Sequence, residues 1–265
     1  MDVLMRVRHE HIVRLVGAGS EPERFLLIER LDGGTLAQRC GHGVGVRDRR
    51  NRFKRQQPFS YVGLLRCGRQ LAEALRHLHE EGIPGRMIIH RDLKPDNIGF
   101  TREGELKVLD LGLAKSLARS EVDGSTFEMT GETGSLRYMA PEVAESRPYN
   151  EKSDVHSYGM VLWEMATMHK PYEGMHRDEF YSRVVRGRAR PPLNKKWPKD
   201  FSDLLESCWD EDPACRPSMA AVCSRLQEMV QEAVDHHTGH ATGRGRKGLL
   251  GRLGLGITDR HSSWF

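Results

Sequence analysis

The stretch IIHRDLKPDNIGF, residues 88–100, decides the fold of this chain. It begins and ends with apolar residues and carries a histidine, an arginine, a lysine, two aspartates and an asparagine between them. A surface loop does not need to open with two isoleucines, and a core strand does not carry that much charge. The pattern therefore predicts a polar, functional loop that is seated on a buried strand.

The composition of the 265-residue chain is that of a globular protein, because 38% of its residues are hydrophobic and 29% are charged. No apolar run reaches the length of a membrane span, and residues 1–11 lack the apolar stretch of a secretory signal. The five cysteines are odd in number and have no C-x-x-C spacing, which argues against a zinc site or a disulfide framework. We expect reduced thiols, a cytoplasmic location and no membrane partner.

Short apolar runs come first in the chain and helical patterns follow. Residues 12–16 and 24–29 predict the strands of a hairpin, and residues 86–112 predict short strands and tight loops. Residues 113–139 lack periodicity and predict one long loop. Helical periodicity marks residues 60–81, 155–165, 176–187, 200–209 and 216–233. The fold class is α+β, with a small strand-containing part ahead of a larger, mainly helical part.

Two further segments are rich in basic residues. Residues 39–55 hold seven arginines and lysines against one acid, and residues 233–265 are rich in glycine, histidine and arginine. We interpret the first as a solvated insertion, with a docking patch for an acidic partner as the alternative, and the second as a disordered tail. Neither has interleaved aromatic residues or a known recognition motif, so we expect no nucleic-acid partner.

Three short motifs in the sequence resemble those of a known protein family. Residues 90–97 fit the pattern H-R-D-L-x-x-x-N, Asp110-Leu111-Gly112 follows with leucine in place of the phenylalanine of D-F-G, and residues 140–142 read A-P-E. Their order and spacing resemble the eukaryotic protein kinases. That resemblance implies a partial N-lobe and a complete, mainly helical C-lobe over residues 1–232.

The resemblance assigns a catalytic and a metal role to four residues. Asp92 would accept the proton of the substrate hydroxyl, and Lys94 would neutralise the transferred phosphoryl group. Asn97 and Asp110 would hold Mg²⁺, so the cofactors would be ATP and Mg²⁺. Phosphoryl transfer needs these residue types because it depends on positioning and charge neutralisation rather than on covalent chemistry by the protein.

Other matching positions have a structural or regulatory role in the family. Arg91 precedes the catalytic aspartate, and kinases with that arginine are ordered by an anion, often a phosphate added by an upstream kinase. Thr130 and Thr133 are the candidate phosphosites. The remaining matches, expected to shape and brace the site, are His90, Leu111, Gly112, Ser135, Glu142, Asp154 and Arg216.

The nucleotide side of the site matches the family only in part. Ile28, Glu29 and Leu31 fall at the gatekeeper and hinge, and Gly99 replaces the large apolar residue below the adenine. The glycine-rich loop and the lysine of V-A-I-K are not among residues 1–265, so we expect an N-terminally truncated domain.

Lys94 and the segment before A-P-E are typical of serine/threonine kinases, and the C-terminal half resembles the tyrosine-kinase-like group. The function predicted is transfer of the ATP γ-phosphate to serine and threonine hydroxyls of proteins in signalling, with weak activity for this chain. The alternative is a non-catalytic, kinase-fold binding module, because the lysine that grips the ATP phosphates is missing.

Overall fold

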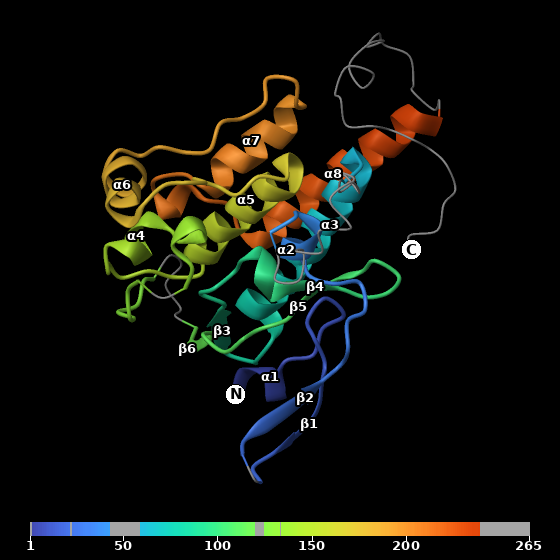
Figure 1. Ribbon diagram of the computed structural model, residues 1–265, viewed down its shortest axis with the longest axis vertical. Coiled ribbons are helices and arrows are strands. Elements are labelled where there is room, and N and C mark those ends of the chain that lie inside the picture. The colour runs from blue at the N-terminus through green and yellow to red at the C-terminus, as the bar shows by residue number, and fades with distance from the viewer. Residues whose placement is uncertain (1, 22, 43–58, 120–124, 133, 239–265) are drawn as a thin grey trace.

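A computed structural model describes residues 2–21, 23–42, 59–119, 125–132 and 134–238. Figure 1 shows a small hairpin at one end, two more pairs of strands in the middle and the long helices at the other end. This is the α+β arrangement that the order of apolar and helical patterns predicts, so the expected fold class is confirmed.

The small part consists of helix α1 (Asp2–Arg6) and the antiparallel strands β1 (Leu15–Gly19) and β2 (Phe25–Ile28). All four side chains of β2 are exposed, although all four are apolar. The isolated bridge between Ile12 and Val108 and the hydrogen bond from Val13 N–H to Val108 O at 2.8 Å join this part to the next strands.

Four short strands form the seat of the opening motif. Strand β3 (Arg86–Ile89) pairs with β6 (Lys115–Ala118), and β4 (Ile98–Phe100) pairs with β5 (Leu106–Val108), both antiparallel. Ile88 and Ile89 are fully buried in β3. The charged residues lie in the loop and the 3₁₀ turn η3 (Pro95–Asn97) between β3 and β4.

Strand β6 corrects one prediction, because residues 113–139 were expected to be a single loop. The segment lacks a sequence period, yet its first residues supply the backbone hydrogen bonds that β3 needs from a neighbour. The 3₁₀ turn η4 (Leu136–Tyr138) orders a second piece of the same segment.

The helices contain the main core. The leucines at the predicted positions 64, 71 and 75 of helix α3 (Tyr61–Arg76) and Leu78 in the following π-helical turn are buried. Helix α3 packs against α5 (Lys152–Thr167) and α8 (Met219–Thr238). The remaining elements are α2 (Leu36–Arg39), the π-helical turn η2 (His77–Glu81), α4 (Pro141–Ala144), α6 (Arg177–Phe180), the π-helical turn η5 (Tyr181–Arg186), α7 (Lys199–Cys208) and the 3₁₀ turn η6 (Pro213–Cys215).

Helix α8 continues further than the sequence suggests. The predicted boundary at residue 232 falls inside α8, which ends at Thr238 and buries Ala233 against the core. The rest of the predicted tail, residues 239–265, lies outside the described residues, as does most of the basic segment 39–55. Within the described part, no helix is both long enough and apolar enough to cross a bilayer.

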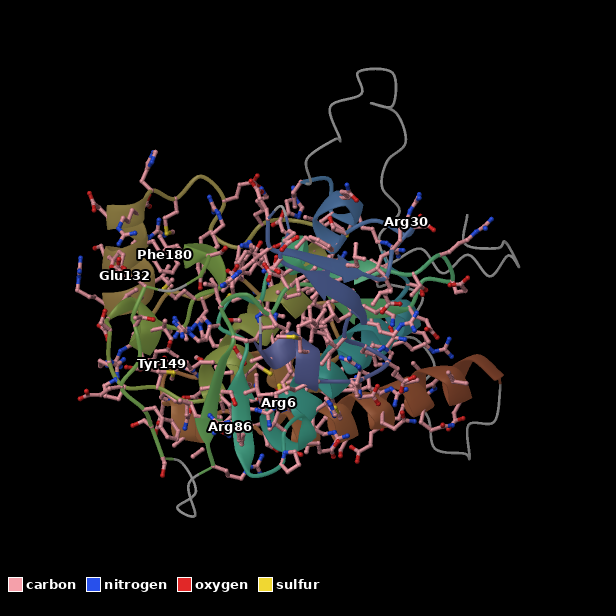
Figure 2. All side chains as sticks on the ribbon, turned by 90° about the horizontal axis from the view of Figure 1, so that it is seen from below. Arg6, Arg30, Arg86, Glu132, Tyr149 and Phe180 are labelled. Atoms are coloured by element: carbon pink, nitrogen blue, oxygen red, sulfur yellow. The ribbon has the colours of Figure 1, made fainter. Side chains whose placement is uncertain are left out.

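A second, smaller hydrophobic cluster lies at the far end of the helical part. It contains Met139, Val143, Tyr149, Phe180 and Val184. Figure 2 shows Phe180, Tyr149 and the nearby Glu132 at the same end of the molecule. This cluster supports the segment that runs from residue 134 through A-P-E and thereby fixes one wall of the site.

Candidate functional site

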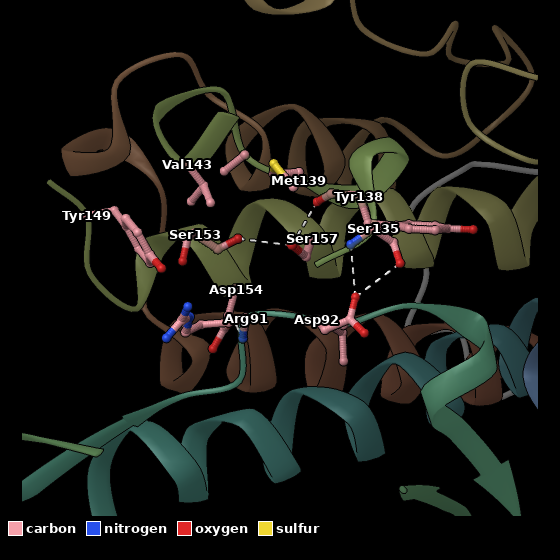
Figure 3. A pocket seen from close by; sticks show the side chains of 12 residues that line it. Arg91, Asp92, Ser135, Tyr138, Met139, Val143, Tyr149, Ser153, Asp154 and Ser157 are labelled. Atoms are coloured by element: carbon pink, nitrogen blue, oxygen red, sulfur yellow. Dashed lines mark hydrogen bonds between the residues drawn. The ribbon is translucent and has the colours of Figure 1, made fainter. Parts of the chain in front are cut away.

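Asp92, Lys94 and Ser135 form a hydrogen-bonded group in front of the loop between β3 and β4. Lys94 Nζ lies 2.7 Å from Asp92 Oδ2 and 3.1 Å from Ser135 Oγ. Asp92 Oδ1 accepts hydrogen bonds from Ser135 N–H at 2.9 Å and from Ser135 Oγ at 3.1 Å, as Figure 3 shows. A carboxylate, an ammonium group and a hydroxyl thus lie within hydrogen-bonding distance of one another, although Ser135 is 43 residues from Asp92 in the sequence.

Asn97 is oriented by the same aspartate. Its side-chain nitrogen donates to Asp92 O at 2.9 Å and to Asp92 Oδ2 at 3.1 Å. Pro95 opens the 3₁₀ turn that brings Asn97 back toward Asp92. Because the amide nitrogen is committed to Asp92, the amide oxygen is the end that remains for a cation.

Asp154 of α5 braces the loop from below. Its Oδ2 accepts from His90 N–H at 2.7 Å and lies 2.9 Å from His79 Nε2, and its Oδ1 accepts from Arg91 N–H at 3.0 Å. Burial alone would raise the pKa of Asp154, but the hydrogen bond and charge of His79 outweigh it and hold that pKa below its usual value. Asp154 therefore remains ionised and fixes the backbone on which Asp92 sits.

The backbone around Asp92 is unusual at two points. Arg91 has φ +72°, a left-handed conformation that non-glycine residues rarely adopt. Gly134 has φ +100°, and a Cβ there would collide with the Arg91 carbonyl oxygen. This close approach is what brings Ser135 within hydrogen-bonding distance of Asp92.

Asp110 and Asn97 supply the donor types that Mg²⁺ prefers, a carboxylate and an amide oxygen. Asp110 is exposed, and Gly112 N–H donates to its Oδ1 at 2.7 Å, which orients the carboxylate. Leu111 is buried in the main core, so the leucine fills a packing position. Among the described residues no group of three His, Cys, Asp or Glu side chains could hold a metal ion.

The expected nucleotide side is brought together only in part. Glu29 Oε1 lies 2.8 Å from Lys107 Nζ and accepts from Arg14 N–H at 2.7 Å, while Ile28 is exposed on β2. A Cβ at Gly99 would lie 2.7 Å from Leu31 Cδ1 and 3.1 Å from Leu109 Cδ2. Leu31 and Leu109 therefore occupy the space over Gly99 that a larger side chain would fill.

Two of the predicted regulatory residues, Arg91 and Thr130, contact each other. Arg91 Nη2 donates to Thr130 Oγ1 at 2.5 Å, whereas Thr133 lies outside the described residues. Arg216 and Glu142 form a buried, two-bond ion pair with distances of 2.6 and 3.0 Å. That pair ties the A-P-E segment to the turn before α8.

Three residues near the site were not predicted. They are His79, Tyr138 and Glu164. His79 contacts Asp154. The hydroxyl of Tyr138, two residues before A-P-E, donates a hydrogen bond to Glu164 at 2.7 Å. The sequence signals these three residues only weakly: each carries a polar group at a position where the helical period or the neighbouring motif predicts burial. The pocket between Arg91, Asp92, Tyr138 and Asp154 in Figure 3 is lined by residues of these same elements.

Comparisons with known proteins agree with this geometry. The sequence profile described as "Protein tyrosine and serine/threonine kinase" matches residues 1–226. The chain is 36% identical over 244 residues to the serine/threonine-protein kinase VIK of Arabidopsis thaliana, covering 90% of the chain and 52% of the relative. It is 32% identical to the Arabidopsis thaliana serine/threonine-protein kinase STY17, covering 88% of the chain and 37% of the relative.

The mitogen-activated protein kinase kinase kinase 7 of Drosophila melanogaster is 35% identical, with 86% of the chain and 31% of the relative covered. The chain thus spans about a third to a half of the length of these curated relatives. The profile match covers most of the chain and agrees with the arrangement of the catalytic loop, D-L-G and A-P-E. This chain therefore belongs to the protein tyrosine and serine/threonine kinase family and, within it, to the tyrosine-kinase-like group.

Proposed function

We propose that this protein is a serine/threonine protein kinase that transfers the γ-phosphoryl group of ATP to serine and threonine hydroxyls of other proteins. The observation that carries the proposal is the hydrogen-bonded group of Asp92, Lys94 and Ser135. A binding module has no chemical need for a carboxylate and an ammonium group held 2.7 Å apart at a loop braced from below by Asp154.

In this proposal each residue has a separate task. A substrate hydroxyl that binds beside Asp92 donates its hydrogen bond to the carboxylate, which orients the attacking oxygen and receives the proton late in the reaction. The Lys94 ammonium stabilises negative charge on the phosphoryl group as it is transferred. Ser135 keeps both side chains in place.

Asn97 and Asp110 would hold Mg²⁺, and Leu31 with Leu109 would contact the adenine above Gly99. Bound Mg²⁺ would neutralise phosphate charge and orient the phosphates. The hinge backbone at residues 29–31 would hydrogen-bond the adenine edge.

Radiolabelled ATP and a general protein substrate such as casein test the proposal. For the longest natural form of the protein we expect label on serine and threonine, and Asp92→Asn should lower the transfer rate about 10²–10⁴-fold. Asp178→Asn, an exposed aspartate on α6, is the matched control and should leave the rate unchanged. Label on tyrosine alone would contradict the proposed substrate class.

Residues 1–265 by themselves should transfer phosphate feebly, because the sequence lacks a V-A-I-K lysine and a G-x-G-x-x-G loop to hold the ATP phosphates. Robust transfer by this chain, lost in Asp92→Ala, would contradict that expectation. If Mg–ATP raised the melting temperature but no natural form transferred phosphate, the non-catalytic binding module would be the better description.

We extend the proposal to regulation and location. A phosphate on Thr130 would place a dianion beside Arg91 and order the segment before A-P-E. Thr133 remains the second candidate phosphosite, and an upstream kinase is the proposed source of the phosphate. The five free cysteines support a reducing, cytoplasmic location. The proposed kinase domain comprises residues 1–232 and the remainder of α8, which ends at Thr238.

A further inference from the structure

The segment of residues 125–132 lies against the chain that follows A-P-E. Phe127 and Tyr149 exchange two backbone hydrogen bonds, at 3.0 and 3.1 Å. Gly131 approaches Ser146 so closely that an added Cβ would lie 2.6 Å from Ser146 Cα. The segment is therefore seated on residues 143–149 at two separate points along its length.

Glu132 ends this segment and is bound through both its backbone and its side chain. Its N–H donates to the carbonyl oxygen of Val143 at 3.0 Å. Its Oε2 accepts a hydrogen bond from Arg177 Nη2 at 2.6 Å, and its Oε1 accepts one from the Tyr181 hydroxyl at 2.6 Å. Figure 2 shows Glu132 at the same end of the molecule as Phe180, the last residue of α6. Both oxygens of one carboxylate are thus bound by α6 and by the turn η5 that continues it.

The conformation and charge of Glu132 fit a residue that is held in place. Its φ of +49° is left-handed, and non-glycine residues keep such a conformation only where the surroundings determine it. The hydrogen bonds from Tyr181 and Arg177 hold the pKa of Glu132 below its usual value, so the carboxylate is ionised at neutral pH. Arg177 Cζ also lies 5.2 Å from the centre of the Tyr181 ring, which keeps the two donors together.

We propose that Glu132 is a positioning residue of the kinase site, anchored on α6 and η5 by Arg177 and Tyr181. The anchor fixes the start of the short chain that leads to Ser135, which contacts Asp92. The effect on catalysis rests on the proposed function, whereas the effect on the segment does not. Arg177 and Tyr181 lie outside every motif identified in the sequence.

The link from Glu132 to Ser135 is short. Only residues 133 and 134 lie between them, and an extended chain spans at most about 3.3–3.6 Å per residue. Gly134 is already pressed against the Arg91 carbonyl oxygen, so it has no room to take up a displacement on that side. A loosened anchor should therefore also loosen the hydrogen bonds from Ser135 to Asp92.

Hydrogen exchange of the backbone amides of residues 125–132, measured on the 265-residue chain by mass spectrometry, tests the anchor without any enzyme assay. After correction for intrinsic rates, Glu132→Ala and Arg177→Met should each exchange about fivefold faster than wild type, because each loses a charge-assisted hydrogen bond at an exposed site. Glu179→Ala is the matched control and should exchange as wild type. Glu179 pairs with Arg183 at 2.8 Å with similar exposure, but that pair lies wholly within α6 and η5.

Combined variants separate this contact from general effects of the substitutions. Glu132→Ala together with Arg177→Met should exchange no faster than Glu132→Ala alone, because the contact is already lost. The charge swap Glu132→Lys with Arg177→Glu should recover part of the lost protection. Exchange in Glu132→Ala that equals wild type, or effects of the two single variants that add in full, would overturn the proposal.

Phosphoryl transfer by the longest natural form supplies the catalytic arm. The turnover number should fall about fivefold in Glu132→Ala and recover in part in the charge swap. The Michaelis constant for ATP should stay unchanged, because the proposed adenine contacts at Leu31 and Leu109 do not involve the segment. Equal turnover in wild type and Glu132→Ala would overturn the catalytic part of this inference. Absence of transfer by every form would refute the proposed kinase activity, while the exchange measurement still decides the role of Glu132.

Discussion

Single residues carry much of the constraint around Asp92. Arg91 is held in a left-handed conformation, and Gly134 approaches its carbonyl oxygen more closely than any residue with a Cβ could. Strained backbone of this kind costs about 1–3 kcal/mol and persists only where the surroundings determine it, here through hydrogen bonds from the backbone of His90 and Arg91 to Asp154. The position of the Asp92 carboxylate is thus set by backbone contacts as well as by side chains.

Gly134→Ala should lower the free energy of unfolding by about 1–3 kcal/mol and reduce phosphoryl transfer further than that loss explains, because Ser135 must move away from Asp92. Gly104→Ala is the matched control, since Gly104 also has a positive φ, +91°, but has no atom within 4 Å of an added Cβ. Urea unfolding of both variants measures the difference. Equal losses would show that the contact with Arg91 does not matter.

His156 on α5 is fully buried, and among the described residues neither ring nitrogen makes a hydrogen bond of normal geometry. Burial and the nearby Arg216 hold its pKa well below the usual 6.5. The folded state therefore binds fewer protons than the unfolded state around and below pH 6.5, so this residue's contribution to stability is present above that pH and is lost as the pH falls, with a slope that approaches about 1.4 kcal/mol per pH unit well below pH 6.5.

His156→Phe should remove that slope. The difference in unfolding free energy between variant and wild type should grow in favour of the variant by about 1 kcal/mol from pH 6.5 to pH 5.5, measured by urea denaturation at each pH. His176→Phe changes an exposed histidine and should show no such trend. A constant difference for His156→Phe would mean that the imidazole is protonated in the folded state.

At the scale of elements, the best-defined link joins α4 to η6. Arg216 donates to both oxygens of Glu142 and also to the carbonyl oxygens of Asp210 and Lys152, all with the side chain out of contact with water. Such a pair adds little net stability compared with apolar residues, but removing one partner leaves a buried, uncompensated charge. The loss of either partner should therefore strongly destabilise the end of the A-P-E segment.

Arg216→Met should lower the unfolding free energy by about 3–5 kcal/mol, because Glu142 then remains buried without a partner. Arg188→Met is the control: Arg188 also pairs with a glutamate, Glu211, but both side chains are exposed, so the loss should stay below about 1 kcal/mol. Adding Glu142→Gln to Arg216→Met should recover part of the loss. If the double variant were as unstable as the sum of the two single variants, the charge would not be the cause.

At the scale of the whole molecule, stability is unevenly distributed. The helical part buries a continuous core between α3, α5, α7 and α8, whereas the β1–β2 hairpin extends from the other end with an exposed apolar strand. Two-stranded hairpins are marginally stable by themselves. The two ends of the molecule should therefore open with different free energies.

Native-state hydrogen exchange of the 265-residue chain should show this difference directly. Amides of β1 and β2 should exchange at least about 100-fold faster than those in the middle of α3 and α5, because opening the hairpin exposes little buried surface. Uniform protection across both parts would contradict the uneven distribution and indicate a single cooperative unit.

The sequence alone predicted the family, the α+β class and the main helices, because these depend on local patterns. The H-R-D-L-x-x-x-N and A-P-E motifs and the 3.6-residue period of the helices are all readable within short windows. The roles of Asp92, Lys94, Asn97 and Asp110 were also proposed there, and they stay proposals until activity is measured.

Only the tertiary structure decided the contacts between distant segments. Strand β6 forms because β3 needs a hydrogen-bonding neighbour, Leu31 and Leu109 fill the space over Gly99, and Glu164 meets Tyr138 and His42 through the packing of α5. None of these contacts has a local signature, since each depends on which buried groups the fold brings within a few ångströms of one another. The sequence therefore determined what chemistry this protein contains, and the packing of α5 against the catalytic segment determined how that chemistry is held in place.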